Sequence, residues 1–292
     1  MRKIHTLHTQ GELTLTTFIE ILKSIFFGIV EGITEWLPIS STGHLILFNE
    51  FINLNFGEEF WEMYSVVIQL GAIMAVVTMF WNKLWPFKLK GGIAVKSSVM
   101  SMWFKVLVSC VPAAVIGLLL DDFFDKYLYN WVTVSIMLIL FGIFFIVIEN
   151  KNKNAVPTVN SISEITYKQA AIIGVWQLIA AAFPGTSRSG ATIIGALLLG
   201  LSRKTAAEYT FYLAVPVMLG ASLLKLVKFG FAFDGASLAV LIVGMVVSYL
   251  VSVIVIKFLL GYIRKHDFKA FGWYRIVLGI IVLLYFILRP SA

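Results

Sequence analysis

Glu31-Gly-Ile-Thr-Glu-Trp-Leu-Pro-Ile-Ser-Ser-Thr-Gly-His44 is the most polar run inside an otherwise apolar segment of this 292-residue chain. It carries two carboxylates, several hydroxyls and a histidine, and Pro38 and Gly43 interrupt it. Polar groups at membrane depth are costly, so such a cluster is by default a functional-site hypothesis. We therefore interpret the remaining chain as a scaffold that holds this stretch, and a second one like it, in the middle of a bilayer.

The overall composition is that of a membrane protein. Hydrophobic residues make up 59% of the chain and charged residues only 13%, and the mean hydropathy is +0.90. Several segments run near 20 apolar residues, the length that crosses a hydrocarbon core of ~30 Å. A membrane β-barrel would instead show short segments of alternating hydrophobicity. The predicted fold class is an all-α polytopic membrane protein.

The remaining composition excludes other classes of protein. The net charge of +7 is attributed to cytoplasmic loops and not to nucleic-acid binding. Cys110 is the only cysteine and lies in an apolar run, so neither a disulfide framework nor a thiolate metal site is expected. The first residues lack the short apolar core and small-residue cleavage site of a signal peptide.

Apolar segments and chain breaks divide the sequence into four parts. These parts are a polar leader (1–17), a first repeat (18–150), a cytoplasmic linker (151–167) and a second repeat (168–292). Two short apolar runs open each repeat, at 18–37 and 40–56 and at 168–183 and 188–201. We interpret each pair as a re-entrant helical hairpin. Full spans are expected at 64–82, 102–120 and 131–149, and then at 208–229, 236–259 and 272–289.

The two halves can be overlaid with an offset of 146 residues. At that offset the chain-breaking and polar positions coincide: Gly28 with Gly174, Ile33 with Ile179, Pro38 with Pro184, Ser41 with Ser187, Glu62 with Glu208, and Glu31 with Gln177. Matched interrupted segments in two halves point to the binding site of repeat membrane proteins. Because three spans separate the hairpins, the second hairpin enters from the opposite face. The sequence thus predicts about six spans and two re-entrant hairpins in an inverted repeat, with both tips near the midplane.

Charged residues divide unevenly between the loops of the two sides. The segments on the membrane side opposite the amino terminus hold fourteen basic residues and only three acidic ones, Glu149, Glu164 and Asp267. The basic residues are Lys83, Lys88, Lys90, Lys96, Lys105, Lys151, Lys153, Lys168, Arg203, Lys204, Lys257, Arg264, Lys265 and Lys269. The opposite loops are acidic and hold Glu50, Glu58, Glu59, Glu62, Asp121, Asp122, Asp125 and Asp234. By the positive-inside rule the basic side is cytoplasmic, so the first hairpin enters from outside and both termini are external.

The first tip combines two carboxylates with a helix start. Glu31 and Glu35 are four residues apart, so a helix places them on one face. Pro38 ends that helix, and Ser40 or Ser41 can cap the next one. A helix start presents unpaired N–H groups and a positive dipole end, which suits an anion and above all a phosphate.

Ser41 and His44 are three residues apart and share a helical face. A hydroxyl and an imidazole within reach of each other suit the roles of nucleophile and general acid or base. His44 alone would more often be an interior histidine with a satisfied hydrogen bond.

The second tip repeats this plan. The pair Pro184-Gly185 breaks the chain, and Thr186 or Ser187 can cap the following helix. Arg188 adds a guanidinium, which binds phosphate oxygens in a bidentate manner, and Ser189 keeps the approach small and polar. Two helix starts and one arginine at a common cavity favour a multiply charged phosphate ester or pyrophosphate.

At these residues the chain resembles a known family, the BacA/UppP-type undecaprenyl-pyrophosphate phosphatases of bacteria. The stretch 31–44 resembles the first motif of that family, and Pro184-Gly-Thr-Ser-Arg-Ser-Gly190 resembles the second. Gln69-Leu-Gly71 and Ala214-Val-Pro216 resemble its satellite patterns. The resemblance covers nearly the whole chain from about residue 20, and only the leader is longer than expected.

The resemblance implies an activity and a set of roles. Such enzymes remove the terminal phosphate of a C55 isoprenoid pyrophosphate, which regenerates the carrier for peptidoglycan synthesis and counters bacitracin. Carried over by motif position, Ser41 is the implied nucleophile, His44 and Glu35 are the acid and base candidates, and Arg188 is the phosphate clamp. Glu31 is implied as a base or metal contact. Phosphate binding is implied for Ser40, Thr42, Thr186, Ser187, Arg188 and Ser189.

The resemblance also implies a cofactor, partners and a location. A divalent cation, magnesium or calcium, is expected to support activity, with Glu31 and Glu35 as its ligands. Two carboxylates without a third ligand are a weak metal signal by themselves. The expected partners are the isoprenoid lipid pyrophosphate and the bilayer, and a homodimer is compatible with the sequence. The expected location is the bacterial inner (plasma) membrane, with the active site facing outside.

Three other interpretations stay open. Inverted repeats with broken helices also build transporters, so a flippase for a phosphorylated lipid would use the same anion site without a nucleophile. A lipid phosphatase with a histidine nucleophile needs a second active-site histidine, whereas only His44 of the four histidines lies at membrane depth. Glu31 and Glu35 could form a purely structural polar pair, and Arg188 could bridge to Glu208.

Overall fold

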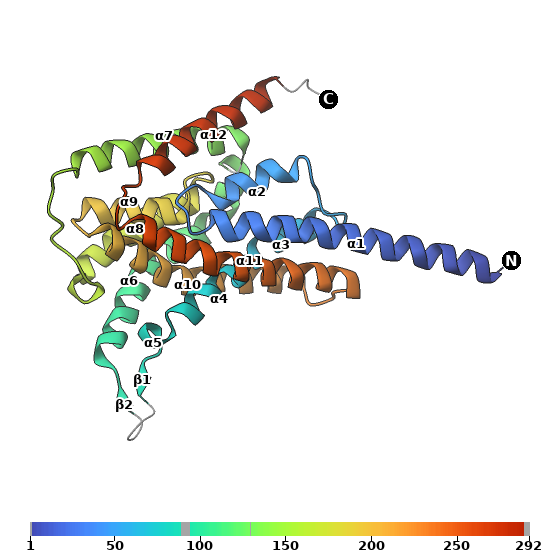
Figure 1. Ribbon diagram of the computed structural model, residues 1–292, viewed down its shortest axis with the longest axis horizontal. Coiled ribbons are helices and arrows are strands. Elements are labelled where there is room, and N and C mark those ends of the chain that lie inside the picture. Colours follow the sequence, from blue (N-terminus) through green and yellow to red (C-terminus); the bar gives the residue numbers. More distant parts are fainter. Residues whose placement is uncertain (1, 89–93, 129, 289–292) are drawn as a thin grey trace.

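The computed structural model describes residues 2–88, 94–128 and 130–288 (Figure 1). Side chains are described from residue 15 onward, apart from those of Leu118, Asp121, Asp122 and Asp125. Four of the charged residues used for the predicted orientation, Lys90 and the three aspartates, thus lie outside the described side chains, as does the end of the predicted second repeat (289–292).

Helices form nearly all of the regular structure in this part of the chain. The first half holds α1 (Arg2–Thr34), α2 (Ser41–Asn49), α3 (Glu58–Val67), α4 (Gln69–Met79), α5 (Trp81–Leu84), α6 (Ser97–Tyr127) and α7 (Trp131–Lys151). The second half holds the 3₁₀ turn η1 (Ile162–Glu164), α8 (Tyr167–Ala182), α9 (Arg188–Leu198), α10 (Arg203–Phe229), α11 (Gly235–Tyr262) and α12 (Lys269–Leu288). One exception to the all-α prediction is a two-residue antiparallel pair, β1 (Phe87–Lys88) with β2 (Ala94–Val95).

Six helical stretches among the described residues are long and apolar enough to cross a membrane, which confirms the predicted class. They are Glu58–Met79, Ser97–Gly117, Trp131–Lys151, Arg203–Phe229, Gly235–Tyr262 and Lys269–Leu288. The first stretch consists of two consecutive helices, α3 and α4. It corresponds to the span that the apolar pattern predicts at 64–82. Large apolar side chains on these helices face outward, among them Ile254 at 67%, Val227 at 66% and Trp273 at 59% exposure. Such an apolar outer surface is the one that lipid would cover.

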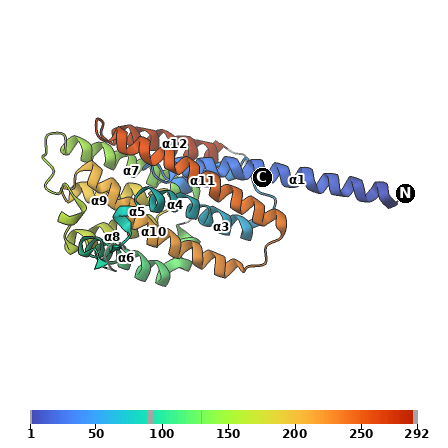
Figure 2. The same cartoon turned by 60° about the horizontal axis from the view of Figure 1, so that its bottom comes forward.

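Helix α1 includes residues 2–17 of the predicted polar leader (1–17) as well as most of the first apolar run, because it continues without a break from Arg2 to Thr34. Its amino-terminal part extends beyond the other helices (Figures 1 and 2).

Three long helix pairs carry the scaffold: α7 with α12, α1 with α11, and α6 with α8. Helices α7 and α12 lie side by side in both views (Figures 1 and 2). They meet at two glycines, because a Cβ on Gly142 would lie 2.7 Å from the carbonyl oxygen of Gly272, and one on Gly272 would lie 2.8 Å from that of Gly142. Small residues at such a crossing let two backbones approach closely.

Side-chain caps mark the starts of three helices that follow loops, α7, α8 and α11. Asn130 accepts a hydrogen bond from the amide of Thr133 at α7, and Asp234 accepts one from Ser237 at α11. Thr166 and Gln169 form a reciprocal capping box at α8. These side chains satisfy the first free N–H groups of each helix.

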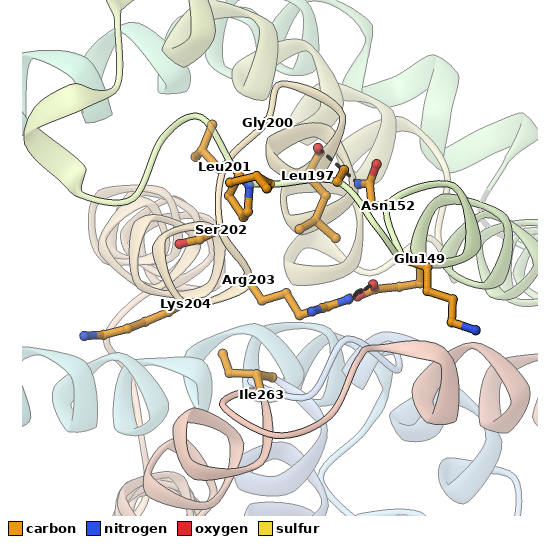
Figure 3. Close-up of a pocket in the computed structure, with 13 residues that line it drawn as sticks. Glu149, Asn152, Leu197, Gly200, Leu201, Ser202, Arg203, Lys204 and Ile263 are labelled. Carbon is orange, nitrogen blue, oxygen red and sulfur yellow. Dashed lines mark hydrogen bonds and ion pairs between the residues drawn. The ribbon is translucent and has the colours of Figure 1, made fainter.

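A carboxylate ties three elements together on the basic side of the molecule. Both oxygens of Glu149 accept hydrogen bonds from Arg203, which starts α10, and one of them also accepts from the amide of Phe268, just before α12. Glu149 and Arg203 border an open cavity of about 310 Å³, from which the side chain of Lys204 extends away (Figure 3). Because Glu149 is buried and its charge is fully paired, we assign this cluster to the scaffold.

Candidate active site at two helix breaks

The first chain break lies between α1 and α2. Ser40 has a positive φ of 75°, and its hydroxyl caps α2 by accepting from the amide of Gly43 at 3.2 Å. Trp36 is fully buried and meets Phe211 of α10 edge to face, with ring centroids 5.2 Å apart. The turn is therefore packed against the second half of the chain, and Ser41 sits at the first position of a capped helix.

The second break lies between α8 and α9 and has the same design. Ser187 also has a positive φ, of 69°, and its hydroxyl accepts from the amide of Gly190 at 3.2 Å. Arg188 is the first residue of α9, as Ser41 is of α2. Helix α9 is buried from Ser189 to Leu197. Among the four capping candidates, the structure selects Ser40 and Ser187 over Ser41 and Thr186.

Glu35 joins the two breaks. One carboxylate oxygen accepts a hydrogen bond from the hydroxyl of Ser41 at 2.7 Å, and the other accepts from Nη2 of Arg188 at 2.8 Å. The hydroxyl of Ser189 donates to the backbone carbonyl of Glu35 at 3.1 Å. Glu35 is only 6% exposed, so these charge-assisted contacts lie in a largely water-free interior, where they are strong. The two halves of the chain thus contribute to one polar site.

Arg188 keeps one donor free. Its Nη1 donates to the backbone carbonyl of Thr210 at 3.1 Å, so the guanidinium is held from two sides. Its Nε is buried and has no hydrogen-bond partner among the described residues. A buried unpaired donor is costly, and this one is available to an acceptor that the described residues do not supply.

Among the described residues, the hydrogen-bond partners of His44 are Ser40 and Tyr274, not Ser41. Its Nδ1 lies 2.7 Å from the backbone carbonyl of Ser40, and its Nε2 lies 2.6 Å from the hydroxyl of Tyr274 on α12. The two rings are stacked, with centroids 5.6 Å apart. A carbonyl only accepts, so Nδ1 carries the proton and, in the neutral ring, Nε2 accepts from Tyr274. The described contacts thus pair Ser41 with Glu35 and His44 with Tyr274.

Glu31 lies one helical turn before Glu35 and is fully buried. Neither of its carboxylate oxygens has a hydrogen-bond partner in the described part of the chain. A carboxylate in this condition needs a cation or a proton to be stable. Within the described residues, no group of three or more His, Cys, Asp and Glu side chains is close enough to hold a metal ion.

The remaining predicted residues lie at the same junction. Thr42 is half-buried in the first turn of α2. Thr186 is buried, and its hydroxyl has no partner among the described residues. The alternative bridge from Arg188 to Glu208 is not formed, since Arg188 contacts Glu35 and Glu208 accepts from Lys83 at 3.1 Å.

Sequence reasoning missed two residues of α12. Tyr274 contacts His44, and Arg275 donates to the carbonyls of Pro38, Gly185 and Thr186 at both breaks. An arginine within a predicted span was the available signal for Arg275, because a charge at that depth is rarely without function. Nothing in the sequence distinguishes Tyr274 from the other tyrosines near span ends.

Six apolar spans around a buried serine, carboxylate and arginine at two helix breaks define a polytopic membrane protein with a buried polar cluster. Comparison with known families agrees, because the family described as "Bacitracin resistance protein BacA" matches residues 24–281. The chain belongs to the BacA family.

Similar proteins in bacteria extend this comparison over almost the full length. The chain is 65% identical to an undecaprenyl-diphosphatase of Desulfitobacterium hafniense, with 93% of this chain and 98% of that protein covered. It is 63% identical to an undecaprenyl-diphosphatase of Enterococcus faecalis, over 91% of this chain and 97% of the other. It is 62% identical to undecaprenyl-diphosphatase 1 of Clostridium acetobutylicum, over 92% and 98%. The chain is accordingly a multi-pass membrane protein of bacteria.

The contacts of His44 predict its tautomer. In protein labelled with ¹⁵N-histidine, we expect Nδ1 of His44 to carry the proton and Nε2 to accept, because the Ser40 carbonyl fixes the Nδ1 side. Tyr274→Phe should change the Nε2 resonance of His44 and leave the other three histidines unchanged. A His44→Gln sample assigns the signal. Observation of the Nε2–H tautomer would contradict the arrangement.

Proposed function

We propose that this chain is an undecaprenyl-diphosphatase, which converts undecaprenyl pyrophosphate to undecaprenyl phosphate and phosphate. The reaction would recycle the lipid carrier of peptidoglycan synthesis and confer bacitracin resistance. The observation that carries the proposal is the contact of Ser41 and Arg188, each at a helix start, with the same carboxylate of Glu35. The names of the similar proteins support the substrate.

The geometry gives each residue a step in hydrolysis. Glu35 accepts the proton of Ser41 as the Ser41 oxygen attacks the terminal phosphorus, so the nucleophile is activated by an adjacent base. The bond from that phosphorus to the bridging oxygen breaks, and the lipid monophosphate leaves. Water then attacks the phosphoserine and releases phosphate, and we propose His44, which contacts Tyr274, as the base that takes the proton of this water.

Charge stabilisation is the larger part of phosphoryl transfer. The free Nε of Arg188 and the positive ends of α2 and α9 supply it, because both helices begin at the site. The hydroxyls of Ser40 and Ser187 are engaged as caps, so they act mainly by fixing those helix starts. Thr42, Thr186 and Ser189 are proposed as further contacts to phosphate oxygens.

The proposed test of the function is phosphate release by purified protein in detergent from a long-chain isoprenoid pyrophosphate. Ser41→Ala and Arg188→Ala should each lower the rate by ~10²-fold or more, the scale for losing a catalytic group. The matched control is Ser98→Ala, since Ser98 is exposed at the start of α6. An inactive wild type, or an unaffected Ser41→Ala, would contradict the assignment.

The same Ser41→Ala variant, measured for both phosphate release and lipid transport, decides between the phosphatase and the alternative of a lipid transporter or flippase. A carrier needs the anion donors of the two helix starts but no nucleophile. Ser41→Ala should spare transport and abolish hydrolysis.

We also propose that the two halves form an inverted repeat with two re-entrant hairpins. Equivalent contacts support it, because α1 packs on α11 as α8 packs on α6. A Cβ on Gly28 of α1 would lie 2.7 Å from a carbonyl of α11, and one on Gly174 of α8 would lie 2.5 Å from a carbonyl of α6. A serine–tyrosine hydrogen bond accompanies each pair, Ser24 with Tyr64 at 2.8 Å and Ser109 with Tyr209 at 2.7 Å.

The proposed orientation places the basic loops in the cytoplasm and the site toward the outside of the inner membrane. In a Cys110→Ala background, a cysteine at Glu59 should react with a membrane-impermeant maleimide on intact cells. A cysteine at Lys153 should react only after permeabilisation, and both side chains are exposed. The reverse pattern would contradict the orientation.

A divalent cation, magnesium or calcium, is proposed as the cofactor. Glu31 and Glu35 are its proposed ligands. Glu31 fits this role, since both its oxygens are buried and without a described partner and these ions prefer carboxylate oxygens, whereas each oxygen of Glu35 already accepts a hydrogen bond. When bound, the cation would neutralise charge on the pyrophosphate. A homodimer stays a prediction of the sequence.

Loss of the Glu31 carboxylate should weaken this cation site. With Mn²⁺ as a paramagnetic probe, we expect Glu31→Gln to raise the dissociation constant by ~10-fold or more, in the range seen when metal sites lose a supporting group. Glu59→Gln is the control, because Glu59 is exposed on α3. Equal Mn²⁺ binding by wild type and Glu31→Gln would remove Glu31 from the site.

A further inference from the structure

Arg275 is a fully buried arginine in the first half of α12. In the described part of the chain its guanidinium has no carboxylate partner. Its contacts are backbone carbonyls and the face of Phe141, whose ring centroid lies 5.8 Å from Cζ. Taking such a charge out of water is costly, and a buried charge persists where it is hydrogen-bonded and has a task.

The carbonyls that Arg275 contacts belong to both chain breaks. Nη1 donates to Pro38 at 3.1 Å, and Nη2 donates to Gly185 at 2.9 Å and to Thr186 at 2.7 Å. Pro38 precedes the cap of α2 by two residues, and Thr186 precedes the cap of α9 by one. A single side chain thus holds both turns, and the planar fork of arginine gives the separate donors that this requires.

Peptide planarity extends the effect of these bonds. A carbonyl aimed at Arg275 directs the N–H of the same peptide unit the opposite way, which applies to the amides of Ile39, Thr186 and Ser187. The guanidinium therefore fixes the orientation of the peptide units that lead into α2 and α9.

The second tip leaves room for this arginine. A Cβ on Gly190 would lie 2.9 Å from Nη1 of Arg275. A larger residue at this position would displace the guanidinium of Arg275, which gives a steric reason for a glycine at position 190 of the second motif.

We propose that Arg275 is a positioning residue that locks the two tips against each other, so that Ser41 and Arg188 act on one phosphate group. The proposal rests on the proposed function for its kinetic part only. The guanidinium of Arg275 bonds to backbone carbonyls of both breaks, and the carboxylate of Glu35 bonds to Ser41 and Arg188, one residue from each break.

Hydrogen exchange of the full-length protein in detergent tests the lock without reference to activity. Arg275→Lys keeps a charge but loses the planar fork of donors, so we expect the segments 36–44 and 184–190 to exchange at least tenfold faster, with α11 unchanged. Arg264→Lys is the matched control, because Arg264 is exposed. Unchanged exchange, or faster exchange in only one tip, would overturn the proposal.

Kinetics separate positioning from general support of the fold. Arg275→Lys should lower kcat/KM by ~10²-fold, as misplacement of reacting groups by about 1 Å does. In an Arg188→Ala background, Arg275→Lys should lower kcat/KM by a factor at least tenfold smaller, because both substitutions disturb the same alignment of Ser41 and Arg188 on the phosphate group. Equal losses in both backgrounds would overturn positioning.

Two further measurements test the lock even if Arg275→Lys does not fold. Gly190→Ala should accelerate exchange in both tips, because its Cβ displaces the fork, and unchanged exchange would count against the lock. In the wild type, the amides of Ile39, Thr186 and Ser187 should exchange more slowly than those of the exposed linker residues Asn154 and Val156, and equal rates would overturn the lock. If the wild type does not hydrolyse the lipid, the exchange results still decide the lock, while the proposed function fails alone.

Discussion

Two helix breaks inside an apolar bundle impose the constraint on which the rest of this structure depends. Free N–H and C=O groups cannot stay unpaired at membrane depth, so irregular backbone survives there only with internal partners. Ser40 and Ser187 satisfy the first amides of α2 and α9, and Arg275 satisfies three carbonyls of the turns. The close-packed pairs of long helices around the breaks keep these partners in place.

The same requirement creates the chemistry. A helix start that is capped and buried is also a preformed anion site, because its amides and dipole point at whatever lies before it. Glu35 then combines two tasks, since it holds Arg188 of one half and accepts from Ser41 of the other. A group with both partners fixed before substrate arrives needs little rearrangement in the reaction, which is the basis of electrostatic preorganisation.

Much of the architecture was readable from residues alone, with specific failures. Pro38 and Pro184 marked both breaks, and the apolar runs marked the six spans, because length and composition decide both. The spacing of Ser41 and His44 put them on one face but could not show that Glu35 would take the hydroxyl and Tyr274 the imidazole. The partner of Arg188 was likewise undecided, because Glu35 and Glu208 are both far from it in sequence. The polar composition of the leader did not indicate that α1 extends through it, since helical backbone does not require an apolar pattern.

The sequence by itself determined the membrane class, the places where the helices break and the residue types gathered there, because hydrophobic length and proline act locally. It also determined the family, through two motifs that each lie within one short stretch. Only the tertiary structure decided which polar groups meet: Glu35 with Ser41 and Arg188, His44 with Tyr274, and Arg275 with both turns. Most of these pairs join residues more than 100 positions apart, and their contact depends on how the long helices pack and not on any local pattern.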